Sequence, residues 1–375
     1  METNHNLEVA GLFCLTFVAS YLCVAGLRRW TEHHNILDKP SERSCHTRPT
    51  CRGGGLAIVI ITLAGFTAYW LFNQDLHWGM LLIYLPGAIL IAVVSWLDDL
   101  YSLPKLIRLP AHSIGAILII LGFGYWQTFA IPCLGSLYLG WFGFLITFFW
   151  IAGLTNAYNF MDGIDGIAGG QAVLAGLGWA VLGTISGQPL TSVLGLLLAA
   201  SSLGFLGHNW PPARIFMGDV GSVFLGYTFA VLSTIAGVKD SRFILAGLLL
   251  VWPFVFDTVF TFLNRLRKGE NVFVSHRSHL YQRLVIVGYS HRFVTLLYIG
   301  LALIGAIFAF AWSLNVEGSG VAISLVIPLL CLGLWVFVIR QERVRAASDY
   351  SQTNSSCPPG VFIRLFPKFS NKSPH

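Results

Sequence analysis

Six aspartates stand near the ends of long apolar runs: Asp98, Asp99, Asp162, Asp165, Asp219 and Asp257. A carboxylate beside hydrocarbon is costly, so each of these residues is a functional hypothesis by default. Carboxylate oxygens are the ligands that hard cations such as Mg²⁺ prefer. If the aspartates gather on one side of a membrane, they predict a site that handles a cation.

The first acidic motif is SWLDDLYSLP, which contains Asp98 and Asp99. Adjacent side chains on a helix point about 100° apart, so the two cannot do the same job. Two ionised carboxylates this close repel each other unless a metal ion, Lys or Arg compensates them. The alternative is a helix C-terminus that meets water, but negative charge has the wrong sign for the helix dipole there.

The densest polar segment is TNAYNFMDGIDGIAGG, in which Asn156, Asn159, Asp162 and Asp165 recur every three residues. An α-helix would spread this row over several faces. A 3₁₀ turn or a glycine-loosened loop could align it. Amides and carboxylates suit a nucleotide, a sugar or Mg²⁺. An ordinary Gly/Asp/Asn turn is the alternative.

The segment FMGDVGS places Asp219 at the start of a predicted membrane span. A carboxylate at a helix N-terminus can cap the helix or bind a metal ion. Capping explains one such residue taken alone, whereas the neighbouring acidic motifs favour a metal ligand.

A basic segment, FDTVFTFLNRLRKGENVFVSHRSHLYQRL, contains Arg265, His276, Arg277 and His279. The two histidines have the spacing of a metal-binding pair. Because Arg277 between them disfavours a cation, we interpret the segment as a rim that binds phosphates. A basic cytoplasmic loop without a ligand is the alternative.

A second basic segment, DKPSERSCHTRPTCRGGG, contains Arg43, His46, Arg48 and Arg52 ahead of three glycines. It indicates either a substrate-binding patch or contact with lipid headgroups.

The composition identifies the elements that must position these motifs. Of 375 residues, 55% are hydrophobic and only 11% are charged, and the mean hydropathy is +0.70. Soluble domains carry about 25% charged residues, so a soluble fold is excluded. The 28 Phe, 12 Trp and 12 Tyr exclude disorder.

We therefore predict an all-α polytopic membrane protein. About eleven apolar runs are long enough to span the bilayer: residues 8–27, 53–72, 79–97, 109–126, 139–156, 168–186, 190–207, 219–237, 243–263, 293–314 and 320–339. With these spans, 21 of the 23 Lys and Arg fall on one side and only Lys239 and Arg242 on the other. The positive-inside rule makes the richer side cytoplasmic, with the N-terminus outside and the C-terminus inside. All six aspartates then lie at the cytoplasmic ends of the spans, and residues 341–375 form a cytoplasmic tail, expected to be poorly ordered.

Basic loops and acidic motifs on one membrane face indicate phosphoryl transfer from a nucleotide-activated substrate to a lipid. A lipid-linked sugar transporter would need polar residues along the whole path through the membrane. An intramembrane aspartyl protease would need two aspartates facing each other within the bilayer. Neither a transporter nor a protease releases UMP, so UMP release would identify a transferase.

Five segments carry a family resemblance: RSCHTRPTCRGGG, LDDL, NAYNFMDGIDGIAGG, FMGDVGS and SHRSHLYQRL, in this order. With them, residues 1–340 resemble the polyprenyl-phosphate N-acetylhexosamine-1-phosphate transferases of glycosyltransferase family 4. The resemblance implies a membrane-embedded transferase domain over residues 1–340, acting at the cytoplasmic face of the bacterial inner membrane. It implies that a UDP-N-acetylhexosamine donates its sugar 1-phosphate to undecaprenyl phosphate and releases UMP. Mg²⁺ or Mn²⁺ is the implied cofactor; a homodimer is an expected assembly and nucleic acid is not an expected partner.

The resemblance also implies roles for single residues. Asp219 matches a metal ligand, and Asp98 matches the base that deprotonates the lipid phosphate, with Asp99 in support. Asn159, Asp162 and Asp165 match the nucleotide- and metal-binding motif, so Asp162 joins Asp219 as a metal candidate. Asn156, Arg43, His46, Arg265 and Arg277 complete the expected site, and His276 and His279 match a histidine motif near the diphosphate or sugar.

The histidine motif departs from the family patterns. The pentapeptide-transferring branch carries three consecutive histidines, and the GlcNAc branch carries His-x-His-His, whereas this chain has His-Arg-Ser-His. HRSHLYQRL resembles the branch that starts O-antigen or capsule chains with a 6-deoxy-N-acetylhexosamine such as FucNAc or QuiNAc. A role in surface polysaccharide synthesis is therefore expected, with peptidoglycan lipid I synthesis as the alternative within the family.

Overall fold

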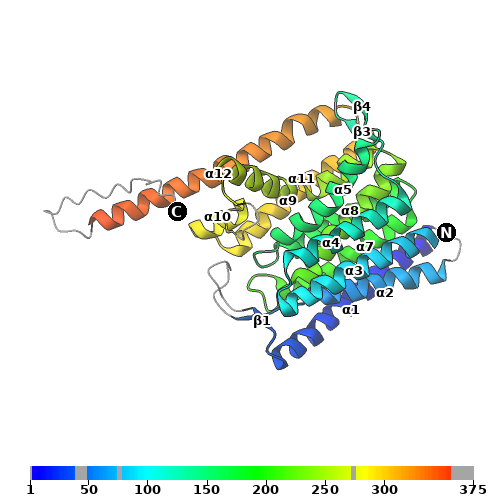
Figure 1. Ribbon diagram of the computed structural model, residues 1–375, viewed down its shortest axis with the longest axis horizontal. Helices are drawn as coiled ribbons and strands as arrows, with labels where there is room; N and C mark the ends of the chain where they lie inside the picture. Colours follow the sequence, from blue (N-terminus) through cyan, green and yellow to red (C-terminus); the bar gives the residue numbers. More distant parts are fainter. Residues whose placement is uncertain (1, 39–48, 74–77, 272–275, 356–375) are drawn as a thin grey trace.

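The structure is a computed structural model that describes residues 2–38, 49–73, 78–271 and 276–355 (Figure 1). It is a bundle of long helices. In chain order they are α1 (Glu2–His33), α2 (Gly55–Phe72), α3 (Trp78–Tyr101), α4 (Lys105–Phe123), α5 (Phe142–Phe160), α6 (Ile167–Ile185), α7 (Pro189–Asn209), α8 (Asp219–Lys239), α9 (Arg242–Arg267), the short α10 (Leu280–Val287), α11 (His291–Ser313) and α12 (Ser319–Ser355).

Within the described part of the chain, ten helices are long and apolar enough to cross a membrane. They match ten of the predicted spans, so the prediction of an all-α polytopic membrane fold is confirmed. The span predicted at 139–156 is α5, a helix of 19 residues. The last turns of α5 carry two polar residues, Asn156 and Asn159.

Proline and glycine mark several helix boundaries, as their backbone preferences require. Pro104 precedes α4, and Pro189 is the first residue of α7. Gly124 ends α4 with φ +91° and Gly166 precedes α6 with φ +78°, a backbone region that favours glycine.

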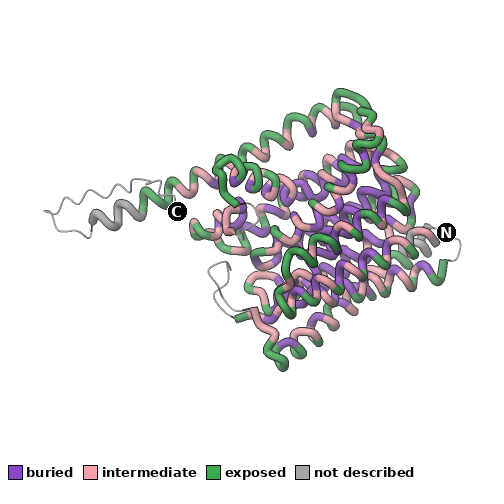
Figure 2. Tube along the Cα trace, viewed as in Figure 1, coloured by how far each residue is buried: buried purple, intermediate pink, exposed green. Residues whose placement is uncertain are grey.

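Helix α8 is the centre of the bundle, and buried positions concentrate around it (Figure 2). It packs against α2, α3, α5 and α9. Small residues permit this packing: a Cβ on Gly226 would lie 2.7 Å from the Leu154 carbonyl oxygen of α5. The central helix therefore begins at Asp219 with neighbours on all sides.

Helix α1 begins and helix α12 ends at opposite ends of the bundle (Figure 1). Which end faces the cytoplasm stays a prediction. Helix α12 does not stop at residue 340 but continues to Ser355, because Gln341–Ala347 consists mostly of good helix formers. The first part of the expected tail is therefore a continuation of α12, and residues 356–375 lie outside the described residues, so the expectation of a poorly ordered cytoplasmic tail stays a prediction.

Two antiparallel strand pairs were not predicted. β1 (Leu37–Asp38) pairs with β2 (Thr50–Cys51), and β3 (Thr128–Ile131) pairs with β4 (Gly135–Tyr138) between α4 and α5. The first pair carries the chain into the polar end of the bundle.

Candidate functional site

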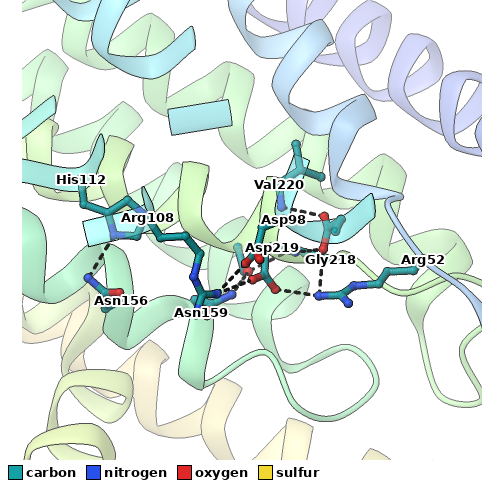
Figure 3. Close-up of polar contacts among 11 residues, drawn as sticks. Arg52, Asp98, Arg108, His112, Asn156, Asn159, Gly218, Asp219 and Val220 are labelled. Carbon is teal, nitrogen blue, oxygen red and sulfur yellow. Dashed lines mark hydrogen bonds and ion pairs between the residues drawn. The ribbon is translucent and has the colours of Figure 1, made fainter. Parts of the chain in front are cut away.

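Three aspartates and two arginines meet at the N-terminus of α8 (Figure 3). Arg52 lies 2.8 Å from both Asp99 and Asp219. Arg108 lies 2.5 Å from Asp98 and 3.3 Å from Asp219. Three carboxylates against two guanidinium groups leave one formal negative charge, so the cluster can accept a further cation.

Backbone pairing brings Arg52 to Asp219 from a distant part of the sequence. The Cys51 carbonyl accepts a hydrogen bond from Phe216 N, and the amides of Gly54 and Gly55 donate to the carbonyls of Phe216 and Met217. The two segments touch so closely that a Cβ on Gly55 would lie 2.4 Å from the Gly221 Cα. Glycine is therefore required where α2 and α8 begin.

Asp99 anchors the start of α8. Its carboxylate accepts the backbone N–H groups of Asp219 and Val220 at 2.8 and 3.0 Å. Its side chain is 2% exposed. Gly218 permits this approach, because a Cβ there would lie 2.6 Å from Asp99 Oδ2. Asp99 is thus a positioning residue, whereas its neighbour Asp98 faces the cavity described below.

Asp98 and Asp219 have the donor chemistry of a Mg²⁺ site. Both carboxylates contact Arg108 and both line the same cavity. Among the described residues, no three His, Cys, Asp or Glu side chains are grouped to hold a metal ion by themselves. Mg²⁺ is usually held by one or two carboxylates together with substrate phosphates.

The row of four polar residues is divided by the end of α5. Asn156 and Asn159 lie on the last turns of the helix and line the cavity. Asn159 donates to Ser222 Oγ of α8 at 3.0 Å, and Asn156 lies 3.2 Å from His112 Nδ1. Asp162 and Asp165 follow in the loop and do not line the cavity. The predicted alignment of all four side chains is therefore wrong, because the helix persists to Phe160.

Asp165 fixes the loop in place. Its carboxylate accepts Ala213 N at 3.0 Å and lies 3.3 Å from His291 at the start of α11. Its carbonyl accepts the Thr295 hydroxyl at 2.8 Å. Asp162 lies nearer the cluster, where burial and the neighbouring Asp219 raise its pKa well above the ordinary value. A bound cation would stabilise the ionised form of a carboxyl group in such surroundings.

A second group of polar residues around the cavity comes from α9 and from the segment that leads into α10. Arg265, His276 and His279 line the cavity, but Arg277 does not. Arg265 donates to the Asn271 carbonyl at 2.7 Å and so ties the end of α9 to the segment that follows it. Asp257 is fully buried behind His279, with its Oδ1 3.3 Å from the ring Nδ1.

These residues enclose a cavity of about 380 Å³ with a polar and an apolar part. Lys105, Arg108 and His112 of α4 line it opposite the histidines. A neighbouring apolar groove of about 250 Å³ runs between α5 and α9. Thr258 and Phe262 line both spaces, so the polar cavity and the groove are adjacent.

The structure thus brings most of the predicted residues together. Arg43 and His46 lie outside the described residues. Sequence reasoning missed the α4 residues Lys105, Arg108 and His112, whose spacing of three and four would have shown one basic helix face.

The chain is similar in sequence to several known proteins. The family model described as glycosyl transferase family 4 matches residues 81–237. A probable undecaprenyl-phosphate N-acetylglucosaminyl 1-phosphate transferase of Bacillus subtilis is 34% identical, covering 82% of this chain and 85% of the relative. A decaprenyl-phosphate N-acetylglucosaminephosphotransferase of Mycobacterium leprae is 31% identical, covering 71% and 75%. A phospho-N-acetylmuramoyl-pentapeptide-transferase of Listeria monocytogenes is 28% identical, covering 79% and 94%.

Proposed function

The chain belongs to glycosyl transferase family 4, and from this membership we propose that it transfers a sugar 1-phosphate from a UDP-N-acetylhexosamine to undecaprenyl phosphate, releasing UMP. The product would be a lipid-linked sugar diphosphate that initiates O-antigen or another surface polysaccharide. The activities for which the relatives are named supply the polyprenyl phosphate and the N-acetylated amino sugar. The nucleotide, the lipid length and the pathway belong to the proposal.

One observation carries the proposal: the polar cavity and the apolar groove are adjacent and share Thr258 and Phe262 in their linings. A polyprenyl phosphate has the same division, with a charged phosphate head and a long hydrocarbon tail. The tail fits the groove between α5 and α9, which is lined by residues such as Phe149, Trp150 and Val259. The phosphate would then lie at Thr258, within reach of the basic face of α4.

The residues of the cavity suggest how the reaction proceeds. Arg108 and Lys105 would hold the acceptor phosphate, and Asp98 would take its remaining proton. An oxygen of the acceptor phosphate would attack the β-phosphorus of the donor. The bond from that phosphorus to the oxygen bridging the two phosphorus atoms would break, and UMP would leave with the bridging oxygen. Asp99 would keep the start of α8 in place.

Asp219 is the first candidate to hold Mg²⁺, with Asp98 or Asp162 as the second ligand. Bound there, the cation would neutralise charge on the donor diphosphate. Arg52 would keep Asp219 oriented through its 2.8 Å contact. Mn²⁺ has the same preference for oxygen ligands and should substitute for Mg²⁺.

The decisive experiment measures UMP release by the purified protein in detergent. Undecaprenyl phosphate, Mg²⁺ and one UDP-sugar at a time would be supplied, including the GlcNAc donor and the 6-deoxy FucNAc and QuiNAc donors. We expect UMP only when lipid and metal are both present, and the fastest donor identifies the pathway. Folded protein that releases no UMP with any donor would contradict the proposal.

The orientation in the membrane needs its own test. The test labels cysteines introduced on either side of the membrane. Gly163, in the loop after α5, is an unsuitable position, because a Cβ there would lie 2.1 Å from the Tyr281 hydroxyl. Exposed Lys268 and Glu317 lie after α9 and before α12, at opposite ends of the predicted topology. In a background without the native cysteines, K268C should react only with a reagent on the cytoplasmic side and E317C only with one outside. The reverse pattern would overturn the predicted cytoplasmic site.

A further inference from the structure

Arg52 and Arg108 both contact Asp219, but they contact different oxygens of its carboxylate (Figure 3). Arg52 Nη2 lies 2.8 Å from Asp219 Oδ1, and Arg108 Nη1 lies 3.3 Å from Asp219 Oδ2. The same Arg108 nitrogen lies 2.5 Å from Asp98 Oδ2. One guanidinium nitrogen is therefore shared by two carboxylates, and a metal ion bound to either of these two oxygens would compete with it.

The surroundings of the two arginines differ. Arg108 lines the polar cavity, whereas the residues that line this cavity do not include Arg52. Arg52 also contacts Asp99 at 2.8 Å, and it follows Cys51, whose carbonyl accepts a hydrogen bond from Phe216 N. Within the described part of the chain, the polar partners of Arg108 are the two carboxylates named above. An anion in the cavity can therefore attract Arg108 away from its partners, while Arg52 stays in place.

The charges of the cluster favour an exchange over an addition. Three carboxylates and two guanidinium groups carry one formal negative charge. A divalent cation added beside both arginines would leave a net positive charge and would place like charges next to each other, which repel. If Arg108 moves away, the cation and Arg52 together balance the three carboxylates.

A phosphate is the anion that Arg108 is suited to bind, because a guanidinium group can present two parallel N–H groups to it. We propose that Arg108 is an exchangeable counter-ion. A phosphate in the cavity draws its guanidinium away from Asp98 and Asp219, and a divalent cation takes its place. This inference rests on the proposed function, which places both a phosphate and Mg²⁺ in the cavity.

The exchange couples the two ligands through one side chain. When Arg108 moves to the phosphate, Asp219 Oδ2 becomes available to the cation and Asp98 Oδ2 to the proton of the acceptor phosphate. By thermodynamic linkage, the phosphate and the cation then raise each other's affinity by the same factor.

The test measures the affinity for Mn²⁺ by paramagnetic resonance in the unmodified protein, Arg108→Gln and Arg52→Gln. Each protein is titrated alone, with undecaprenyl phosphate and with UDP. We expect undecaprenyl phosphate to tighten Mn²⁺ binding about fivefold or more in the unmodified protein and in R52Q, but less than about twofold in R108Q. R52Q is the matched control, because it removes the same charge from beside Asp219 and leaves Arg108 in place.

The UDP titration identifies which phosphate takes Arg108, since the lipid and the donor offer the same chemistry. Loss of the lipid effect in R108Q assigns the acceptor phosphate, and loss of the UDP effect assigns the donor diphosphate. If both effects are as large in R108Q as in R52Q, the phosphates act on the cation directly and the proposal is overturned. Without either ligand, R108Q should bind Mn²⁺ more tightly than the unmodified protein, and weaker binding would also overturn the exchange.

Arg108→Lys replaces R108Q if the glutamine variant does not fold. Its single ammonium group keeps the charge but lacks the two parallel N–H groups, so the coupling should decrease at least about twofold. Coupling equal to that of the unmodified protein would contradict the proposal.

The Mn²⁺ titrations are independent of turnover. If the unmodified protein releases no UMP with any donor, the proposed function fails, while the titrations still decide the role of Arg108. If it releases UMP but its coupling does not depend on Arg108, the function stands and the exchange is rejected.

Discussion

A buried aspartate anchors the start of both α8 and α10, but the groups that surround its negative charge differ between the two helices. At each, a buried aspartate from an earlier helix accepts two successive backbone N–H groups: Asp99 holds α8, and Asp257 holds α10. Asp99 also contacts the guanidinium of Arg52. Asp257 has instead a tyrosine hydroxyl, a threonine hydroxyl and the ring of His279.

This difference separates two tasks within one cavity. At α8, full charges oppose one another, and a cation can alter the balance among three aspartates and two arginines. At α10, hydrogen-bond donors surround a single buried anion. The first arrangement suits phosphate and metal chemistry, and the second fixes the start of α10 beside the cavity.

The largest expected effect comes from the α8 side. Asp219→Asn should lower the rate of UMP release about 10³-fold, because the carboxylate that would hold Mg²⁺ is lost. Asp240→Asn is the matched control, since Asp240 pairs with Arg242 at the other end of α8. Turnover of D219N near the rate of D240N would exclude Asp219 as a metal ligand.

Asp98→Asn should lower the rate about 10²-fold at neutral pH, as expected for loss of a general base. The variant should keep its affinity for Mn²⁺ better than D219N does, a difference that paramagnetic resonance can measure. A rate close to that of the unmodified protein would exclude an essential base at this position.

Gly218→Ala tests the anchoring of α8 by Asp99. The added Cβ would lie 2.6 Å from Asp99 Oδ2, and the backbone has φ +78°. We expect about a tenfold loss of rate together with a lower melting temperature, because strain and a displaced carboxylate act together. Gly269→Ala is the control: it also has positive φ, at +70°, but nothing lies within 4 Å of its Cβ. Equal melting temperatures for the two variants would argue against the anchor.

A smaller effect should appear on the α10 side as a dependence on pH. The pKa of His276 falls from 6.5 in the unfolded chain to about 4 in the fold. As the pH drops through this window, the unfolded chain binds a proton that the folded chain does not, so stability decreases. His276→Gln removes this contribution, and its melting temperature should fall less between pH 6.5 and pH 4. Parallel curves for both proteins would contradict the assignment of a neutral His276.

The smallest effect concerns the attachment of α10 to α12. Arg283 forms a two-pronged ion pair with Glu342 at 2.6 and 2.7 Å. Glu342 is 37% exposed, so Glu342→Gln should cost at most about 1 kcal/mol. The melting temperature should change slightly and donor affinity should stay the same. A large loss of sugar binding would show that α12 helps to set the position of α10.

The sequence was sufficient to predict the spans, because runs of apolar residues report membrane crossing directly. The gathering of Asp98, Asp219, Asn159 and His279 at one end followed from the same spans. The hydrogen-bonding partners could not be predicted, since pairs such as Asp257 with His279 depend on how helices pack. The roles of Asp98 and Asp99 also separated only in the structure, where one faces the cavity and the other faces backbone amides.

The pairing of residues 51–55 with residues 215–217 has a consequence for how the protein is made. Arg52 and Asp219 are 167 positions apart in the chain. During synthesis the arginine leaves the ribosome long before its partner exists, and domains form as their segments emerge. Nascent chains that end before α8 should therefore enter the membrane yet lack a phosphate site. The cavity can be completed only later still, when α9 and the segment leading into α10 have followed the central helix out of the ribosome.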